Sequence, residues 1–195
     1  MVEPSNPVNP SNVAAIEKAS GRSWADWVAL LDEAGAREEP HPRIAELALE
    51  RLDVANGNNG WWAQSVAVAY EQHVGRRLPG QRPDGTFDAS VSRTVAGRRD
   101  EVARRWSDLA AAGLAEVRAG APGPLGAGPE GEPRTSATDR RAYWRLDLDD
   151  GTRAAVSFED KGADRVLVTA THTRIPAPDG VASRKAAWRE LLAAL

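Results

Sequence analysis

The sequence contains no cysteine. Disulfide bonds, thiolate nucleophiles and cysteine-ligated zinc or iron are therefore excluded. Histidine is scarce as well, and none of His41, His73 and His172 has a second histidine two to four residues further along the chain. A metal site built on closely spaced ligands has no support in this pattern, so we expect neither a metal ion nor another cofactor.

A strong charge of either sign and long apolar runs are also missing. Lysine and arginine total 25 against 28 acidic residues, which gives a formal net charge of -3. This balance argues against a polyanionic partner. No stretch approaches the ~18 apolar residues of a membrane span, and the first residues lack the basic and apolar segments of a signal peptide. We expect no nucleic-acid partner, no membrane span and a cytoplasmic location.

Hydrophobic residues make up 42% of the 195 positions, which is enough for a buried core. Residues 1–11 are rich in proline and asparagine and predict a disordered leader. Residues 12–76 predict a helical domain. Its first helix follows Ser23, a favourable N-cap, the second begins near Pro42, and the third begins near Gly60. The expected architecture of this part is a three-helix bundle.

The third predicted helix, GWWAQSVAVAYEQHVG, covers residues 60–75 and carries two adjacent tryptophans. One apolar stripe runs through Trp62 and another through Trp61, so its apolar surface is wider than the ~100° of a helix that is covered on one side. We expect both tryptophans to lie in the core of the bundle. In the alternative interpretation, Trp61, Trp62 and Tyr70 contact a neighbouring domain or a partner.

Residues 77–86 contain two prolines and two glycines and predict a linker, after which the hydrophobic period changes. A strand from Phe87 is followed by a helix over residues 98–117 and by a Pro/Gly-rich segment, 119–141, that predicts an irregular loop. Three alternating strands and a final helix complete an α+β pattern. The alternating and helical positions are Ala142, Trp144, Leu146 and Leu148; Ala154, Val156 and Phe158; Val166, Val168, Ala170 and His172; and Trp188, Leu191, Leu192 and Leu195.

This order of elements, with the third strand reading VLVTATHTRIP and the last helix WRELLAAL, resembles the START-related helix-grip (SRPBCC) superfamily. The similarity is to the branch that includes the activator of the heat-shock-protein-90 ATPase. The segments SGRSWADWVALLDEAG and WWAQSVAVAYEQHVG resemble a small bacterial helical domain of unknown function that precedes such domains.

The resemblance implies an antiparallel sheet wrapped around the C-terminal helix, with a cavity that often takes up an apolar molecule such as a lipid or a polyketide. The residues expected to face this cavity are Trp106, Trp144, Phe158, Val168, His172 and Trp188. Segment 119–141 stands where the superfamily has further strands. We therefore expect a shortened helix-grip domain over residues 87–195 and a reduced cavity.

No catalytic group can be assigned from the sequence. Residues 126–131, GAGPEG, match the letters of a dinucleotide-binding motif, but Pro129 interrupts the match and no helix is predicted after it. His172 is the one polar residue expected in the cavity. We expect a non-enzymatic protein that binds an apolar small molecule. The alternatives are a chaperone-associated or regulatory module that binds a protein client, and a cyclase- or aromatase-type enzyme. The oligomeric state stays open.

Overall fold

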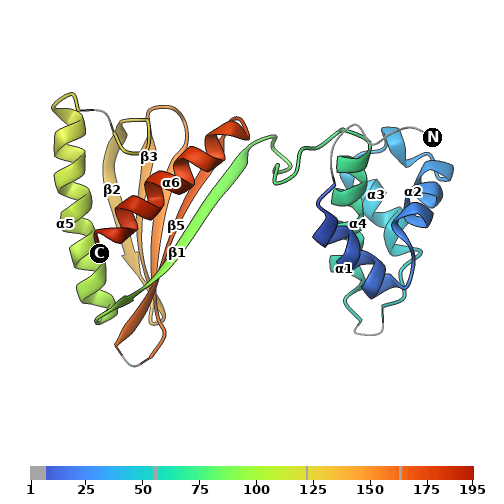
Figure 1. Cartoon of the computed structure of the whole chain (residues 1–195), viewed down its shortest axis with the longest axis horizontal. Coiled ribbons are helices and arrows are strands. Elements are labelled where there is room, and N and C mark those ends of the chain that lie inside the picture. Colours follow the sequence, from blue (N-terminus) through green and yellow to red (C-terminus); the bar gives the residue numbers. More distant parts are fainter. Residues whose placement is uncertain (1–7, 55–56, 122, 163) are drawn as a thin grey trace. The chain divides into compact units, whose positions relative to one another are not determined.

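The structure is a computed structural model that describes residues 8–54, 57–121, 123–162 and 164–195. The chain divides into two compact units, Met1–Gly80 and Gln81–Leu195 (Figure 1). Most of the predicted leader, residues 1–7, lies outside the described residues. Its last part does not match the prediction, because a helix begins at Pro10. We describe each unit by itself.

The described residues of the first unit form four α-helices, whereas three were predicted. They are α1 (Pro10–Ser20), α2 (Trp24–Glu33), α3 (His41–Leu49) and α4 (Asn59–His73), with the short 3-10 helix η1 (Ala36–Glu38) before α3. The additional helix is α1. Among the side chains described for α1, Ile16 is the large buried one, and it packs in the core of this unit. A single buried apolar residue leaves too weak a period for sequence analysis to detect.

Helix α2 begins and ends where its sequence predicts. The Ser23 hydroxyl accepts a hydrogen bond from the backbone N–H of Asp26 at 3.2 Å, as expected of an N-cap. Gly35, which follows the helix, has a φ of 74°, a conformation that glycine adopts without steric cost. Trp27 and Leu31 are fully buried, so this helix contributes two of the large side chains of the core.

One side of helix α4 packs in the core of the first unit, and Trp61 lies on the opposite, exposed side. Ala63, Val66 and Tyr70 are buried at helical spacing, and the Tyr70 hydroxyl donates a hydrogen bond to Asp32. Trp62 is partly buried against the same core, whereas Trp61 is 56% exposed and touches the Trp62 ring edge-on. The expectation that both tryptophans fill the core is therefore wrong for Trp61. The enclosed position of Tyr70 removes it from any exposed contact surface of this unit.

We expect Trp61→Ala to change the free energy of unfolding by less than about 0.5 kcal/mol, as is usual for exposed positions. Trp62→Ala should cost more than about 1 kcal/mol, because it removes apolar contacts with the core. Urea unfolding of both single variants tests this difference. Equal losses would show that Trp61 is buried in solution.

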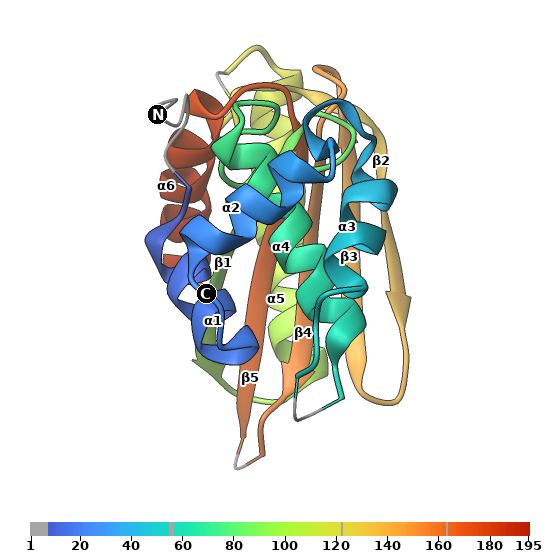
Figure 2. The ribbon, with the colours of Figure 1, turned by 90° about the vertical axis from the view of Figure 1, so that its right-hand side faces the viewer.

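The second unit is a five-stranded antiparallel sheet with two helices (Figure 2). Its strand order is β1-β5-β4-β3-β2. Gln81 forms a bridge with Phe87, so residues 81–86, predicted as linker, fold back onto the start of this unit. The α+β class is confirmed. The elements in chain order are β1 (Phe87–Ala96), α5 (Arg99–Arg118), β2 (Pro129–Ala137), β3 (Arg141–Leu148), β4 (Arg153–Asp160), β5 (Arg165–Ile175) and α6 (Asp179–Ala193).

Strand β2 lies within segment 119–141, where an irregular loop was predicted. It pairs only with β3 and forms one edge of the sheet, and its register shifts between Glu130 and Arg134. Most of its side chains are exposed, so β2 has no alternating apolar face, and proline occurs within it. Backbone pairing to β3, rather than side-chain burial, defines this strand.

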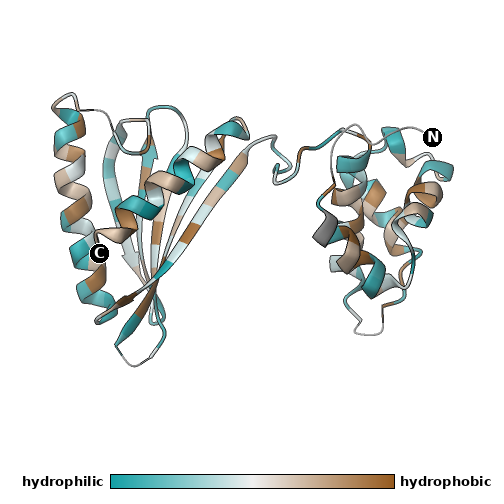
Figure 3. Ribbon diagram, in the orientation of Figure 1, coloured by the Kyte–Doolittle hydropathy of each residue, from teal (hydrophilic) through white to brown (hydrophobic). Residues whose placement is uncertain are grey.

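Strands β3, β4 and β5 alternate buried apolar residues with more exposed ones as predicted (Figure 3). Their apolar residues share one face of the sheet, and α5 and α6 pack against that face. Val102 and Trp106 of α5 are buried there, as are Trp188 and Leu192 of α6. The opposite face carries ion pairs such as Arg141–Glu159, with 2.6 Å between Nη2 and Oε2. The core of this unit therefore lies between the sheet and its two helices.

Candidate functional site: an apolar pocket between α5, α6 and β3

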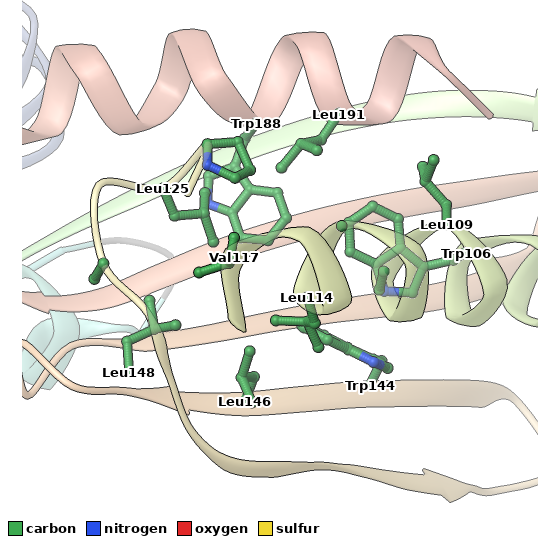
Figure 4. Close-up of a pocket in the computed structure, with 14 residues that line it drawn as sticks. Trp106, Leu109, Leu114, Val117, Leu125, Trp144, Leu146, Leu148, Trp188 and Leu191 are labelled. Carbon is green, nitrogen blue, oxygen red and sulfur yellow. The ribbon is translucent and has the colours of Figure 1, made fainter. Parts of the chain in front are cut away.

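A partly open pocket lies within the core of the second unit, between α5, α6 and β3 (Figure 4). Its volume is about 70 Å³. The segment that connects α5 to β2 forms part of its wall. The lining residues are Trp106, Leu109, Ala110, Gly113, Leu114 and Val117 from α5; Pro124, Leu125 and Ala127 from the connecting segment; Trp144, Leu146 and Leu148 from β3; and Trp188 and Leu191 from α6.

Simple periodicities bring these residues together. On α5, Leu109, Gly113 and Val117 follow one another at four-residue intervals and therefore share a face of the helix. On β3, Trp144, Leu146 and Leu148 alternate with polar residues and point to the helix-covered side of the sheet. The apolar face of α5 and that of β3 do not pack completely against each other, and the space left between them is the pocket.

Three tryptophan rings form one wall of the pocket. The ring centroids of Trp106 and Trp144 are 5.6 Å apart with the planes at 86°, an edge-to-face arrangement. The centroids of Trp106 and Trp188 are 5.9 Å apart with a tilt of 36°. Since each ring belongs to a different element, this contact fixes the mutual positions of α5, β3 and α6 at the pocket.

Two of these indoles carry a buried hydrogen-bond donor without a partner. The Nε1 atoms of Trp106 and Trp188 are inaccessible to solvent, and neither makes a hydrogen bond within the described residues. A buried indole normally finds an acceptor, because an unsatisfied donor costs ~1–3 kcal/mol. Both unsatisfied donors belong to side chains that line the same pocket. Figure 4 shows both rings among the residues around the space.

Gly113 lies within α5, at the pocket. A glycine in a helix interior costs ~0.5–1 kcal/mol relative to alanine. A Cβ atom added at Gly113 would meet no other atom within 4 Å, so close packing does not require glycine there. The residue does keep the pocket open, because a larger side chain at this position would occupy it.

A polar cluster that includes His172 lies in the core beside the pocket. His172 is fully buried, and its Nε2 lies 2.7 Å from the Thr152 hydroxyl, which donates to Asp150. Arg184 Nε donates to the same ring nitrogen, His172 Nε2, at 3.3 Å. His172 Nδ1 has no partner among the described residues. The ring centroids of His172 and Trp188 are 6.4 Å apart.

The surroundings of His172 favour its neutral form. Burial and the nearby positive charge of Arg184 lower the pKa of His172 to about 4, although Asp150 acts in the opposite direction. Arg184 donates to Asp150 at 2.9 Å and thereby joins α6 to the β3–β4 turn. Burial alone would raise the pKa of Asp150, but the hydrogen bonds from Thr152 and Arg184 outweigh it and lower that pKa.

The structure places the six predicted cavity residues at three locations. Trp106, Trp144 and Trp188 line the pocket. Phe158 is buried next to a different groove, one that Tyr143 also lines. Val168 and His172 are fully buried in the core and do not line the pocket.

Several pocket residues were not among the predicted ones. Leu146 and Leu148 share the strand face of Trp144, and Leu109 belongs to the stripe of α5, so their spacing could have identified them. Leu125 could not have been found in this way. It is the only large apolar residue of a Pro/Gly-rich stretch, and no periodicity predicts its direction.

Among the described residues, no group of three or more His, Asp or Glu side chains is placed to hold a metal ion. None of the described helices has both the length and the apolar character needed to cross a membrane.

Comparisons with protein-family models, with curated proteins and with solved structures find no match to this chain.

Proposed function

We propose that Gln81–Leu195 is a shortened helix-grip domain. The order of its elements supports this: a strand, a helix, a meander and a final helix, with the first strand paired to the last. Helix α6 packs on β1 and β5, and α5 packs on β3 and β4, so that both helices cover the same face. The space between the two helices is where such a domain would hold a ligand.

We further propose that this domain binds an apolar small molecule without transforming it. The observation that carries the proposal is the pocket between α5, α6 and β3, whose walls consist of Trp, Leu, Val, Ala, Pro and Gly residues. Burial of apolar area would drive binding, at ~25 cal/mol per Å². Among the described residues that line the pocket, none carries a carboxylate, an imidazole or a hydroxyl group, so the pocket offers nothing for acid–base or nucleophilic catalysis.

The size of the pocket restricts the ligand. Pockets that enclose drug-sized molecules have volumes of ~300–1,000 Å³, whereas this one has about 70 Å³. This is roughly half of the ~150 Å³ that encloses a benzene ring, so the pocket accommodates a short branched chain or part of a ring. A lipid- or polyketide-like molecule would therefore insert one apolar end and leave the remainder outside, or would displace Leu125 and its neighbours from the wall.

Gly113→Leu provides a test that does not require the natural ligand. The new side chain would fill the pocket from α5, and the helix should become no less stable, because leucine has a better helix propensity than glycine. Nuclear magnetic resonance spectra of the protein with methylenecyclopentane, a small apolar probe, should show shifts at Trp106 and Trp188. Gly113→Leu should abolish these shifts. Shifts that persist unchanged would place the binding site elsewhere.

A second candidate function, a protein–protein contact, is favoured by the exposure of Trp61. This side chain is 56% exposed on α4, and tryptophan is enriched at the energetic centres of interfaces. We propose that Met1–Gly80 uses Trp61 to bind a protein client. A partner isolated from the native host should be retained by the unchanged protein and by Gly113→Leu but lost with Trp61→Ala. Retention by Trp61→Ala would remove this candidate.

A further inference from the structure

The two edges of the five-stranded sheet differ in how well they are protected against pairing with a further strand. Strand β2 forms one edge, and its register shifts between Glu130 and Arg134, with Pro133 inside the shift. Proline and such irregularities keep an edge from pairing. Strand β1 forms the other edge, and from Ala89 to Ala96 it contains neither a proline nor a register shift. The edge of β1 therefore lacks the protection that β2 has.

The register of β1 shows which of its backbone groups are left unpaired. The backbone N–H of Gly97 donates to the carbonyl of Asp164 at 2.7 Å, and these two residues continue the register of β1 with β5. In an antiparallel pair, residues that bond to the partner strand alternate with residues whose N–H and C=O groups point away from it. The residues of β1 that point away from β5 are Ser90, Ser92, Thr94 and Ala96, and all four are exposed.

The side chains along this edge do not oppose a further strand. Charged side chains commonly protect edge strands, but the residues that point away from β5 are uncharged. Arg93, which lies between two of them, is turned towards α6, where its Nη1 donates to the carbonyl of Leu192 at 3.0 Å. Gln81 forms a bridge with Phe87 and so occupies the beginning of the edge. The free part runs from Ser90 to Ala96.

We propose that β1 pairs with β1 of a second copy of this chain, in antiparallel orientation and centred on Thr94, so that the two sheets become continuous. Thr94 then lies opposite Thr94 of the second copy, and Ser92 lies opposite Ala96. Threonine pairs across antiparallel strands are favourable. A pairing centred on Arg93 would instead set two like charges opposite each other. A pairing centred on Ser92 would bring the second copy onto Phe87, where Gln81 already lies.

The edge favours a second copy over a foreign peptide. Peptides that add a strand to a sheet gain their specificity from pockets beside the edge, but neither the pocket between α5, α6 and β3 nor the groove beside Tyr143 includes a residue of β1. A two-fold axis lets one row of donors and acceptors satisfy its own copy. The net charge of -3 causes little repulsion between copies. Because the contact is one strand wide, we expect monomer and dimer to be in equilibrium.

Sedimentation equilibrium of the full chain over a range of concentrations tests the proposal. The mass should rise from 20.9 kDa towards twice that value. Thr94→Pro removes a backbone N–H that points away from β5, so it should raise the dissociation constant of the dimer about tenfold or more. Thr135→Pro is the matched control, because the N–H of Thr135 points outward from the β2 edge, and it should leave the dissociation constant unchanged. Thr94→Lys, which sets two like charges opposite each other only in the dimer, replaces Thr94→Pro if proline prevents folding.

A mass of 20.9 kDa at every concentration would overturn the proposal. So would a dimer that neither Thr94→Pro nor Thr94→Lys weakens. Loss of the dimer with Trp61→Ala, together with its persistence in both Thr94 variants, would place the contact on α4 instead.

The arrangement of the two copies has a separate test, because the chain contains no cysteine and one introduced cysteine reports its own position. The Cα atoms of a hydrogen-bonded antiparallel pair are ~5.5 Å apart, a distance that a disulfide bond spans. Thr94→Cys should therefore form a covalent dimer under mild oxidation. In Ser90→Cys the two cysteines would be ~27 Å apart along the paired strands and should not react. Cross-linking of Ser90→Cys as fast as that of Thr94→Cys would contradict pairing centred on Thr94.

Discussion

Trp188→Ala is expected to destabilise Gln81–Leu195 by about 3–5 kcal/mol, the usual cost of truncating a fully buried tryptophan. The Trp188 ring is completely buried and contacts Trp106 and His172. It therefore joins α6 to α5 and to the sheet. Its removal leaves a cavity that merges with the existing pocket, and the surrounding side chains can only partly fill it. Urea unfolding, followed through resonances of the second unit, measures the loss.

The control for this prediction is Trp61→Ala, which removes the same side chain from an exposed position and should leave stability nearly unchanged. The resonances of the first unit should unfold at the same urea concentration in Trp188→Ala as in the unchanged protein. A loss below about 1 kcal/mol for Trp188→Ala would mean that α6 does not pack on the sheet through this residue.

Acidification between pH 6.5 and pH 4 is expected to destabilise the second unit by about 3 kcal/mol through His172. The pKa of His172 falls to about 4 in the folded protein, chiefly because the ring is buried. The unfolded chain has the ordinary value near 6.5 and takes up the proton first. Stability from this group is therefore complete above pH 6.5 and is lost as the pH falls towards 4. Unfolding curves measured across this pH range give the slope of the free energy of unfolding against pH and so test the prediction.

His172→Gln should flatten that slope, because glutamine can still donate a hydrogen bond to Thr152 but does not titrate. Carboxylates with lowered pKa values, Asp147 and Asp150 among them, lose their contribution only below their ordinary value near 4 and therefore act at lower pH. His73 also has a lowered pKa, because it is partly buried, so only resonances of the second unit should be followed. An unchanged slope in His172→Gln would exclude His172 as the cause.

The elements that bury an apolar face were predictable from the sequence. Trp144, Leu146 and Leu148 alternate along β3, and Val102 and Trp106 lie in line on α5, so hydrophobic period alone places them on the core side. Strand β2 was not predictable, because its side chains are mostly exposed and only its backbone pairs with β3. Helix α1 was missed for a related reason, since Ile16 is the large buried residue among those described for it.

The site itself could be predicted only in part. The helix-grip resemblance implied that Trp106, Trp144 and Trp188 face a cavity, and they line the pocket. It implied the same for Phe158, Val168 and His172, which lie elsewhere in the core. Sequence period assigns a residue to a face. It does not show where two apolar faces pack incompletely, and the pocket between α5, α6 and β3 is such a place. The contribution of Leu125 depends on the path of a Pro/Gly-rich segment that no pattern predicts.

The most direct test of the account is the native mass spectrum of the protein purified from its native host, compared with that of Gly113→Leu. The account predicts a bound apolar compound of a few hundred daltons that is released on denaturation and is absent from Gly113→Leu. A spectrum of the unchanged protein without any bound compound, or a compound that Gly113→Leu retains in equal amount, would contradict the conclusion that the pocket between α5, α6 and β3 is a ligand site.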